Sequence, residues 1–195
     1  MAFEFVIAGV GGQPIDRMIE LLAAACEAAD QAMSCTLPRG VVLLGGSRMA
    51  QVSVGEAWSP IVTEDTGGAV LALEVGEALR AAKFCGFDGV ALVDATVIPP
   101  TAPRDPRPYP GPAEIEPALK EVIKTVHVAD FGALCAKAGA SSGDVHAFLL
   151  GALSKVKGMD FVASGWKAGL KAAGATEGES DAFKAGAEWA GGAKL

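Results

Sequence analysis

A glycine turn near the start of the sequence is the first feature that could bind a ligand. The run Gly9-Val10-Gly11-Gly12-Gln13 follows a short apolar segment and precedes an amphipathic one that begins at Ile15. Backbone N–H groups at a helix start carry positive potential, and glycine lets a phosphate or carboxylate approach them. The candidate contacts are therefore Gly9, Gly11, Gly12 and Gln13. Tight strand–helix packing or a subunit contact is the alternative interpretation.

Two well-known phosphate-binding patterns do not match this first turn. Pro14 stands where the dinucleotide-binding pattern GxGxxG has its last glycine, and the Lys-Ser/Thr pair of a P-loop is absent. Proline suits the first position of a helix, because its missing N–H would be unpaired there in any case.

A second glycine turn carries a neighbouring cation. Its residues are Gly45, Gly46, Ser47 and Arg48. An arginine beside a glycine turn could form an anion site or contact a cofactor held elsewhere. The alternative is a loop with a solvated arginine.

Four further acidic residues could take part in binding. Glu64 and Asp65 are adjacent, so in an extended chain they point to opposite sides, which favours solvated carboxylates over a metal site. Asp94 ends a predicted parallel strand, where ligands bind in open α/β sheets. Asp130 precedes a predicted helix and suits its N-cap.

The cysteines and histidines argue against a metal centre held by this chain alone. No two cysteines are closer than nine residues, and there is no CxxC pair (Cys26, Cys35, Cys85 and Cys135). Cys26 and Cys135 lie in alanine-rich stretches and are predicted to be buried packing thiols. His127 and His146 are nineteen residues apart, so we expect neither to bind a metal, and the alternation of His127 with Val126 and Val128 predicts an outward position on a strand. We expect Trp166 and Trp189 to pack in the core or at an interface, and Tyr109 to contact another subunit.

The elements that must position these residues alternate between strand and helix over the first 140 residues. Strands are predicted at residues 3–8, 41–44, 49–55, 89–94 and 125–129, with an apolar run at 69–73 and a polar connection at 31–39. Helices are predicted at residues 15–26, 75–82, 115–123, 131–138, 145–156, 161–173 and 181–190. Residues 99–112 hold seven prolines and are predicted as an extended loop.

This pattern predicts a Rossmann-like α/β fold, a mostly parallel sheet flanked by helices with a helical C-terminal tail. We expect one domain over residues 1–195, with an α/β core at 1–140 and the tail at 141–195.

Composition excludes several classes of protein. Sixteen basic against 23 acidic residues give a net charge of −7, and no basic block offers the clustered charge that nucleic acids require. The chain is 51% hydrophobic with a mean hydropathy of +0.36, too apolar for a disordered protein. Its longest stretch free of Asp, Glu, Lys and Arg covers residues 5–15, shorter than a membrane span, and lacks the basic start of a signal peptide. We therefore expect a cytoplasmic protein that binds neither nucleic acid nor membrane.

Seven short motifs, in order, carry a resemblance to a known family. They are FVIAGVGGQ at 5–13, GGSRMAQVSVG at 45–55, SPIV at 59–62, LALEVGEALR at 71–80, VDATVIPP at 93–100, HAFLLGAL at 146–153 and FKAGAEWA at 183–190. Together they cover nearly the whole chain. The sequence resembles the gamma-type subunit of 2-oxoacid:ferredoxin oxidoreductases, and within that group the small, beta-type subunit of indolepyruvate:ferredoxin oxidoreductase.

The resemblance implies a subunit of a complex. Such enzymes decarboxylate a 2-oxoacid on thiamine diphosphate and Mg²⁺, pass electrons through [4Fe-4S] clusters to ferredoxin, and use CoA as co-substrate. It implies that thiamine diphosphate and clusters sit on partner subunits, while this chain shapes the CoA approach and is inactive alone.

The chain departs from the family pattern at both turns. The family usually has glycine where this chain has Pro14, and arginine where it has Leu44. These departures weaken a phosphate contact and would suit a divergent member, such as a phenylglyoxylate-type enzyme. A free-standing Rossmann-like CoA or nucleotide binder and a purely architectural protein are the alternatives.

Overall fold

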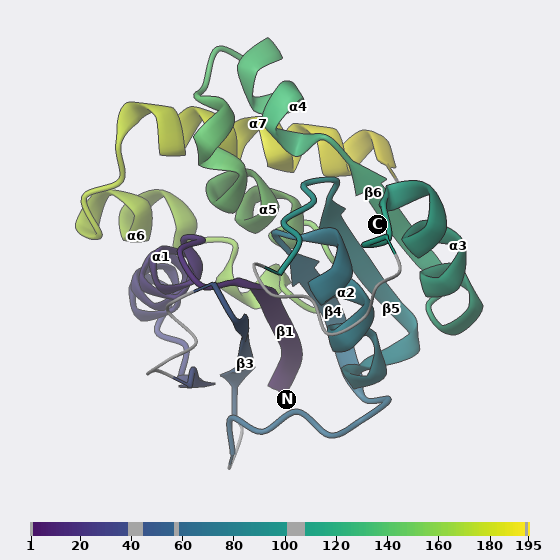
Figure 1. Cartoon of the computed structure of the whole chain (residues 1–195). Coiled ribbons are helices and arrows are strands. Elements are labelled where there is room, and N and C mark those ends of the chain that lie inside the picture. The colour runs from purple at the N-terminus through teal and green to yellow at the C-terminus, as the bar shows by residue number, and fades with distance from the viewer. Residues whose placement is uncertain (1, 39–44, 57–58, 101–107, 194) are drawn as a thin grey trace.

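The computed structural model describes residues 2–38, 45–56, 59–100, 108–193 and 195. In these residues one six-stranded sheet has the order β2-β3-β1-β4-β5-β6. In Figure 1 the labelled strands β3, β1, β4 and β5 follow one another in this order from left to right. Strands β1, β4, β5 and β6 are parallel to one another, whereas β3 pairs antiparallel with both β1 and β2. The strands are β1 Ala2–Val10, β2 Met33–Thr36, β3 Ser47–Gly55, β4 Gly67–Ala72, β5 Cys85–Asp94 and β6 Thr125–Ala129. The predicted α/β class and mostly parallel sheet are confirmed.

Alternating side chains of the strands feed two separate apolar layers. Phe5 and Ile7 of β1 belong to one cluster, and the intervening Val6 belongs to the other, as the period-two alternation of a strand requires. Helices α1, α4, α5, α6 and α7 pack on the first face, and α2 and α3 on the second. The helices are α1 Ile15–Ala28, α2 Val75–Ala81, α3 Pro112–Val122, α4 Phe131–Lys137, α5 Val145–Leu153, α6 Trp166–Ala172 and α7 Glu177–Ala193.

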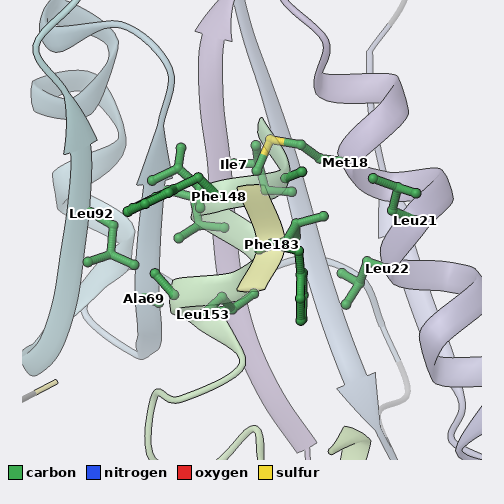
Figure 2. Packing of buried hydrophobic residues seen from close by; sticks show 14 of the residues in the cluster. Ile7, Met18, Leu21, Leu22, Ala69, Leu92, Phe148, Leu153 and Phe183 are labelled. Carbon is green, nitrogen blue, oxygen red and sulfur yellow. The ribbon is translucent and has the colours of Figure 1, made fainter. Parts of the chain in front are cut away.

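The larger layer joins the C-terminal helices to the sheet. Figure 2 shows Phe148 and Leu153 of α5 gathered with the strand residues Ile7 and Leu92. Helices α5 and α7 lie so close together that a Cβ on Gly151 or Gly186 would overlap the backbone of the other helix. Because tail and strands share this core, the structure supports the predicted single domain, which stays a prediction.

Some predicted boundaries are wrong and one predicted strand is untested. Residues 31–39 were predicted as a polar connection, but they contain β2, which pairs with β3 although its sequence has little alternation. Helix α7 begins at Glu177, four residues before the predicted start at 181. Pro14 is the N-cap of α1 rather than its first helical residue. The predicted strand at 41–44 lies outside the described residues.

Three further boundaries differ: the predicted helix 161–173 is divided into a short 3-10 turn at Asp160–Val162 and α6, α3 begins at Pro112 inside the segment predicted as extended, and β5 begins at Cys85 rather than at 89. The other predicted strands and helices among the described residues are found near their predicted places. Among the described helices, none combines the length and the apolarity needed to cross a bilayer.

Candidate functional site

The two glycine turns lie side by side. Strands β1 and β3 are antiparallel, so the carboxyl end of β1 meets the amino end of β3, and Val10 faces Ser47 in the register. The Gly11 N–H donates a hydrogen bond of 2.8 Å to the Gly46 carbonyl. Residues 9–13 and 45–48, predicted as separate sites, therefore form one surface, which we call the paired glycine turns.

This surface lies where ligands bind in open α/β sheets. It follows the carboxyl end of β1, which is parallel to β4. Helix α1 leaves β1 on one face of the sheet, and α2 leaves β4 on the other. Such a change of face between neighbouring parallel strands is a topological switch point, the usual place for a ligand.

Glycine backbone faces outward at both turns, beside the exposed Ser47. Gly12 has φ +98° and Gly45 has φ +90°, and among the described residues a Cβ added to either would meet no atom within 4 Å. The left-handed backbone explains both glycines, because an L side chain is strained there. The open space beside them leaves room for a ligand or a partner subunit.

Gln13 joins the two strands of the switch point. Its Oε1 accepts a hydrogen bond from the Val10 N–H at 2.8 Å, and its Nε2 donates to the Leu73 carbonyl at 2.7 Å. A Cβ on Gly9 would lie 2.6 Å from Gln13 Oε1, so glycine is needed for this close approach. Both polar ends of the Gln13 side chain thus have partners within the chain.

Arg48 is a buried, paired cation. Its guanidinium donates to both carboxylate oxygens of Asp16, at 2.6 and 2.8 Å, and its side chain is 3% exposed. The interpretation of a solvated arginine is therefore wrong, because α1 supplies a carboxylate in its first turn. The hydrogen bond to Asp16 raises the pKa of Arg48, and the pair cancels most of the positive charge at the turns.

Ser47 is tied to a buried acid that the prediction did not single out. The Ser47 hydroxyl donates to Glu77 of α2, whose other oxygen accepts from Arg80 Nε at 3.1 Å. Glu77 is 3% exposed. Burial raises the pKa of its carboxyl, although the hydrogen bond from Ser47 and the charge of Arg80 oppose that rise.

A second buried acid lies one turn earlier. Glu74 is the N-cap of α2 and is fully buried; it accepts from the N–H groups of Glu77 at 2.8 Å and Ile98 at 3.1 Å. The Tyr109 hydroxyl donates to it at 3.2 Å, and burial raises the pKa of Tyr109 to about 12. The Tyr109 hydroxyl thus packs on this chain's own α2, and the predicted contact of Tyr109 with another subunit stays a prediction. The sequence signal for Glu74 was its position three residues before Glu77 at the start of a helical stretch, the spacing of an N-cap and its third helical residue.

Other predicted positions have structural partners. Asp94 is buried and accepts from the Phe131 N–H at 3.0 Å and from the Thr96 hydroxyl, and burial raises its pKa. Asp130 accepts from the Ala133 N–H at 2.7 Å, which confirms the predicted N-cap. Glu64 is exposed and forms an ion pair with Lys83, with 2.6 Å between Glu64 Oε1 and Lys83 Nζ.

The cysteines do not gather as ligands of a metal or cluster. The predicted burial of Cys26 and Cys135 is confirmed, and burial raises the pKa of each thiol to about 11. Over the described ranges, no three His, Cys, Asp or Glu side chains are grouped as a metal site would require. The described cysteines therefore do not provide the Cys₄ ligand set of an iron–sulfur cluster.

His146 has a polar role that the sequence did not reveal. Its Nε2 lies 3.0 Å from Glu179 Oε1, and Arg17 donates to the same carboxylate at 2.7 and 2.9 Å. His127 is half-buried and packs edge-on to Trp189 of α7, with ring centroids 5.3 Å apart, so its predicted outward position is wrong because α7 covers this side of the strand.

Two hollows of about 580 Å³ lie away from the paired glycine turns. One is lined by Cys26 of α1 and Met33 of β2, and the other by Gly67 and Phe87 at the amino ends of β4 and β5. Glu27 and Asp30 also line the first hollow, and Asp65, Asp88 and Lys157 the second, but neither lining includes a residue of the paired glycine turns.

Comparison with known proteins gives concordant results. A model of the family described as pyruvate ferredoxin/flavodoxin oxidoreductase matches residues 4–189. The chain is 29% identical over 140 residues to a protein of Methanothermobacter thermautotrophicus named indolepyruvate oxidoreductase subunit IorB, which covers 71% of each chain.

Solved structures share the fold. A keto/oxoacid ferredoxin oxidoreductase gamma subunit from Geobacter sulfurreducens has a TM-score of 0.65 at 19% identity, covering 99% of this chain and 98% of that one. A 2-oxoglutarate:ferredoxin oxidoreductase from Magnetococcus marinus, described with 2-oxoglutarate, coenzyme A and succinyl-CoA bound, has a TM-score of 0.61 at 17% identity. The match covers 98% of this chain and 31% of that one.

Proposed function

The chain belongs to the pyruvate ferredoxin/flavodoxin oxidoreductase family, and from this premise we propose that it is the gamma-type subunit of a 2-oxoacid:ferredoxin oxidoreductase. The observation that carries the proposal is the paired glycine turns at the switch point. They present backbone and open space, while the side chains of Gln13, Ser47 and Arg48 are bound within the chain. This arrangement suits a surface that completes a site held by partners.

The proposed division of labour follows from the groups this chain offers. Thiamine diphosphate, Mg²⁺ and [4Fe-4S] clusters would reside on partner subunits, as the resemblance to the family implies. The described cysteines do not gather as cluster ligands, which agrees with this division. This chain would line the approach of CoA with the paired glycine turns, whose open backbone permits a close approach. In isolation it would have no activity.

For the substrate we propose an aryl 2-oxoacid such as indolepyruvate or phenylglyoxylate. The support is the resemblance of the sequence to IorB-type subunits at 29% identity. The pocket for the 2-oxoacid would lie mainly on the partner that holds thiamine diphosphate.

Purification without a tag from the native source, under anaerobic conditions, tests the proposal. We expect the chain to elute with partners that carry thiamine diphosphate and iron–sulfur clusters, and the complex to reduce ferredoxin with an aryl 2-oxoacid and CoA. Pyruvate and 2-oxoglutarate serve as comparison substrates. Recovery as a lone monomer that melts at a higher temperature with CoA or NAD would favour a free-standing binder instead.

A further inference from the structure

Glu77 is a buried acid attached to the paired glycine turns. It is 3% exposed and lies on α2, next to the fully buried Glu74. One of its oxygens accepts from the Ser47 hydroxyl, at the amino end of β3. The charged groups around it are Arg80 and Glu74 from α2 itself, with the hydroxyl of Ser47 facing it from β3.

The Ser47–Glu77 hydrogen bond lies next to the left-handed residue of the second glycine turn. Gly45 is left-handed and open, and only Gly46 separates it from Ser47. The hydrogen bond between Ser47 and Glu77 spans 30 residues and links β3 to α2. It therefore holds the second turn against the helix that follows β4, just as Gln13 holds the first turn against the end of β4.

The hydrogen bond to Glu77 also fixes the direction in which the Ser47 hydroxyl proton points. An ionised carboxylate can only accept, so the Ser47 proton points inward toward Glu77. The exposed face of the hydroxyl oxygen is left with lone pairs that accept a hydrogen bond. A buried carboxylate costs desolvation energy that an apolar residue on the same helix face would avoid, so packing alone does not explain a glutamate here.

We propose that Glu77 is a positioning residue, which acts through Ser47 to fix the second glycine turn and to orient the Ser47 hydroxyl as an acceptor. This inference rests on the proposed function, in which the paired glycine turns line the CoA approach. Glu77 itself touches no substrate.

Steady-state kinetics of the intact complex test the proposal. Ser47→Ala and Glu77→Ala each remove the hydrogen bond, and we expect each to raise the KM for CoA about tenfold, the factor for one lost hydrogen bond, with kcat unchanged within about twofold. Because both variants lose the same contact, the double variant should raise KM no further than either alone. Ser47→Thr and Glu77→Gln keep a hydroxyl donor and an oxygen acceptor, and should restore KM to near the wild-type value.

Controls separate positioning from folding. Glu116→Ala removes a carboxylate from the exposed Glu116–Lys120 pair on α3 and should leave both KM and kcat unchanged. Ser47 is exposed, so Ser47→Ala tests the proposal even if Glu77→Ala fails to fold. The positioning role of Glu77 would be overturned if Ser47→Ala kept the wild-type KM for CoA, or if it lowered kcat alone.

A variant of the first turn distinguishes this inference from the proposed function. Gly12→Val places a side chain in the open space, and Gly139→Val introduces the same positive-φ strain at a remote position with equally open surroundings. If Gly12→Val raises the KM for CoA but Ser47→Ala does not, the role of Glu77 fails alone. If neither changes KM relative to Gly139→Val, the proposed CoA approach fails as well.

Discussion

Single residues in this protein hold elements together through buried charge. Glu179 of α7 is 5% exposed and takes two hydrogen bonds from Arg17 of α1, and one of its oxygens lies 3.0 Å from the His146 ring on α5. The Arg17 hydrogen bond holds the pKa of the Glu179 carboxyl well below its usual range. Three helices thus meet on one carboxylate, whose negative charge is compensated by its partners.

We expect Glu179→Gln to lower the free energy of unfolding at pH 7 by about 2 kcal/mol, because Arg17 would lose its buried carboxylate partner and keep only the exposed Glu20, at 2.7 Å. The lowered pKa means that this contribution is present above about pH 4.5, the ordinary range of a glutamate, and is lost as pH falls toward the folded value. Urea unfolding of both proteins between pH 7 and pH 3 should show the difference shrinking.

The surface pair Lys184–Asp181 on the same helix provides the control. Asp181→Asn should leave the denaturation midpoint unchanged, because exposed pairs contribute little. A difference between Glu179→Gln and wild type that stays constant from pH 7 to pH 3 would show that charge is not the cause.

At the scale of elements, glycine sets the distance between helices. A Cβ on Gly186 of α7 would overlap the carbonyl oxygen of Phe148 on α5, and one on Gly151 of α5 would overlap that of Phe183 on α7. Gly165 and Gly169 approach Ala25 of α1 in the same way. These reciprocal approaches let the tail helices lie close to the helices beneath them.

Gly186→Ala should therefore lower the free energy of unfolding by about 3 kcal/mol, the upper part of the range for overpacking, because the α5 and α7 backbones must separate. Gly191 lies in the same helix, and a Cβ there would meet no atom of the described residues within 4 Å. Gly191→Ala should raise stability by up to about 1 kcal/mol through helix propensity alone. Chemical denaturation of the two variants compares them directly, and equal effects would contradict the packing explanation.

At the scale of the whole molecule, the tail and the sheet share one apolar layer. Phe148 of α5 and Phe183 of α7 belong to the same cluster as Phe5 and Ile7 of β1. The tail helices cover one face of the sheet, which would otherwise expose that apolar layer to water.

We expect the chain to unfold in one cooperative transition for this reason. Hydrogen exchange followed by mass spectrometry across a urea series should show α7 and β1 losing protection at the same denaturant concentration. Protection of β1 that persists after α7 has opened would show that the tail folds as a separate unit.

Local patterns were sufficient for much of the fold. The apolar run before Gly9, the helical period from Ile15 and the buried strand ending at Asp94 each depend on neighbours in sequence, so their predicted types were correct. Strand β2 was missed because its short sequence has little alternation and it forms by pairing with β3. The two glycine turns were identified as candidates, but nothing local indicated that they are adjacent.

The sequence by itself therefore determined the α/β class, the glycine turns and the capping role of Asp130. Only the tertiary structure decided how the polar side chains are used. Gln13 bonds to Leu73, Arg48 to Asp16 and Ser47 to Glu77. Each of these contacts joins two elements whose separation in space depends on the order of the strands, and a hydrogen bond forms only when that order brings donor and acceptor within about 3 Å.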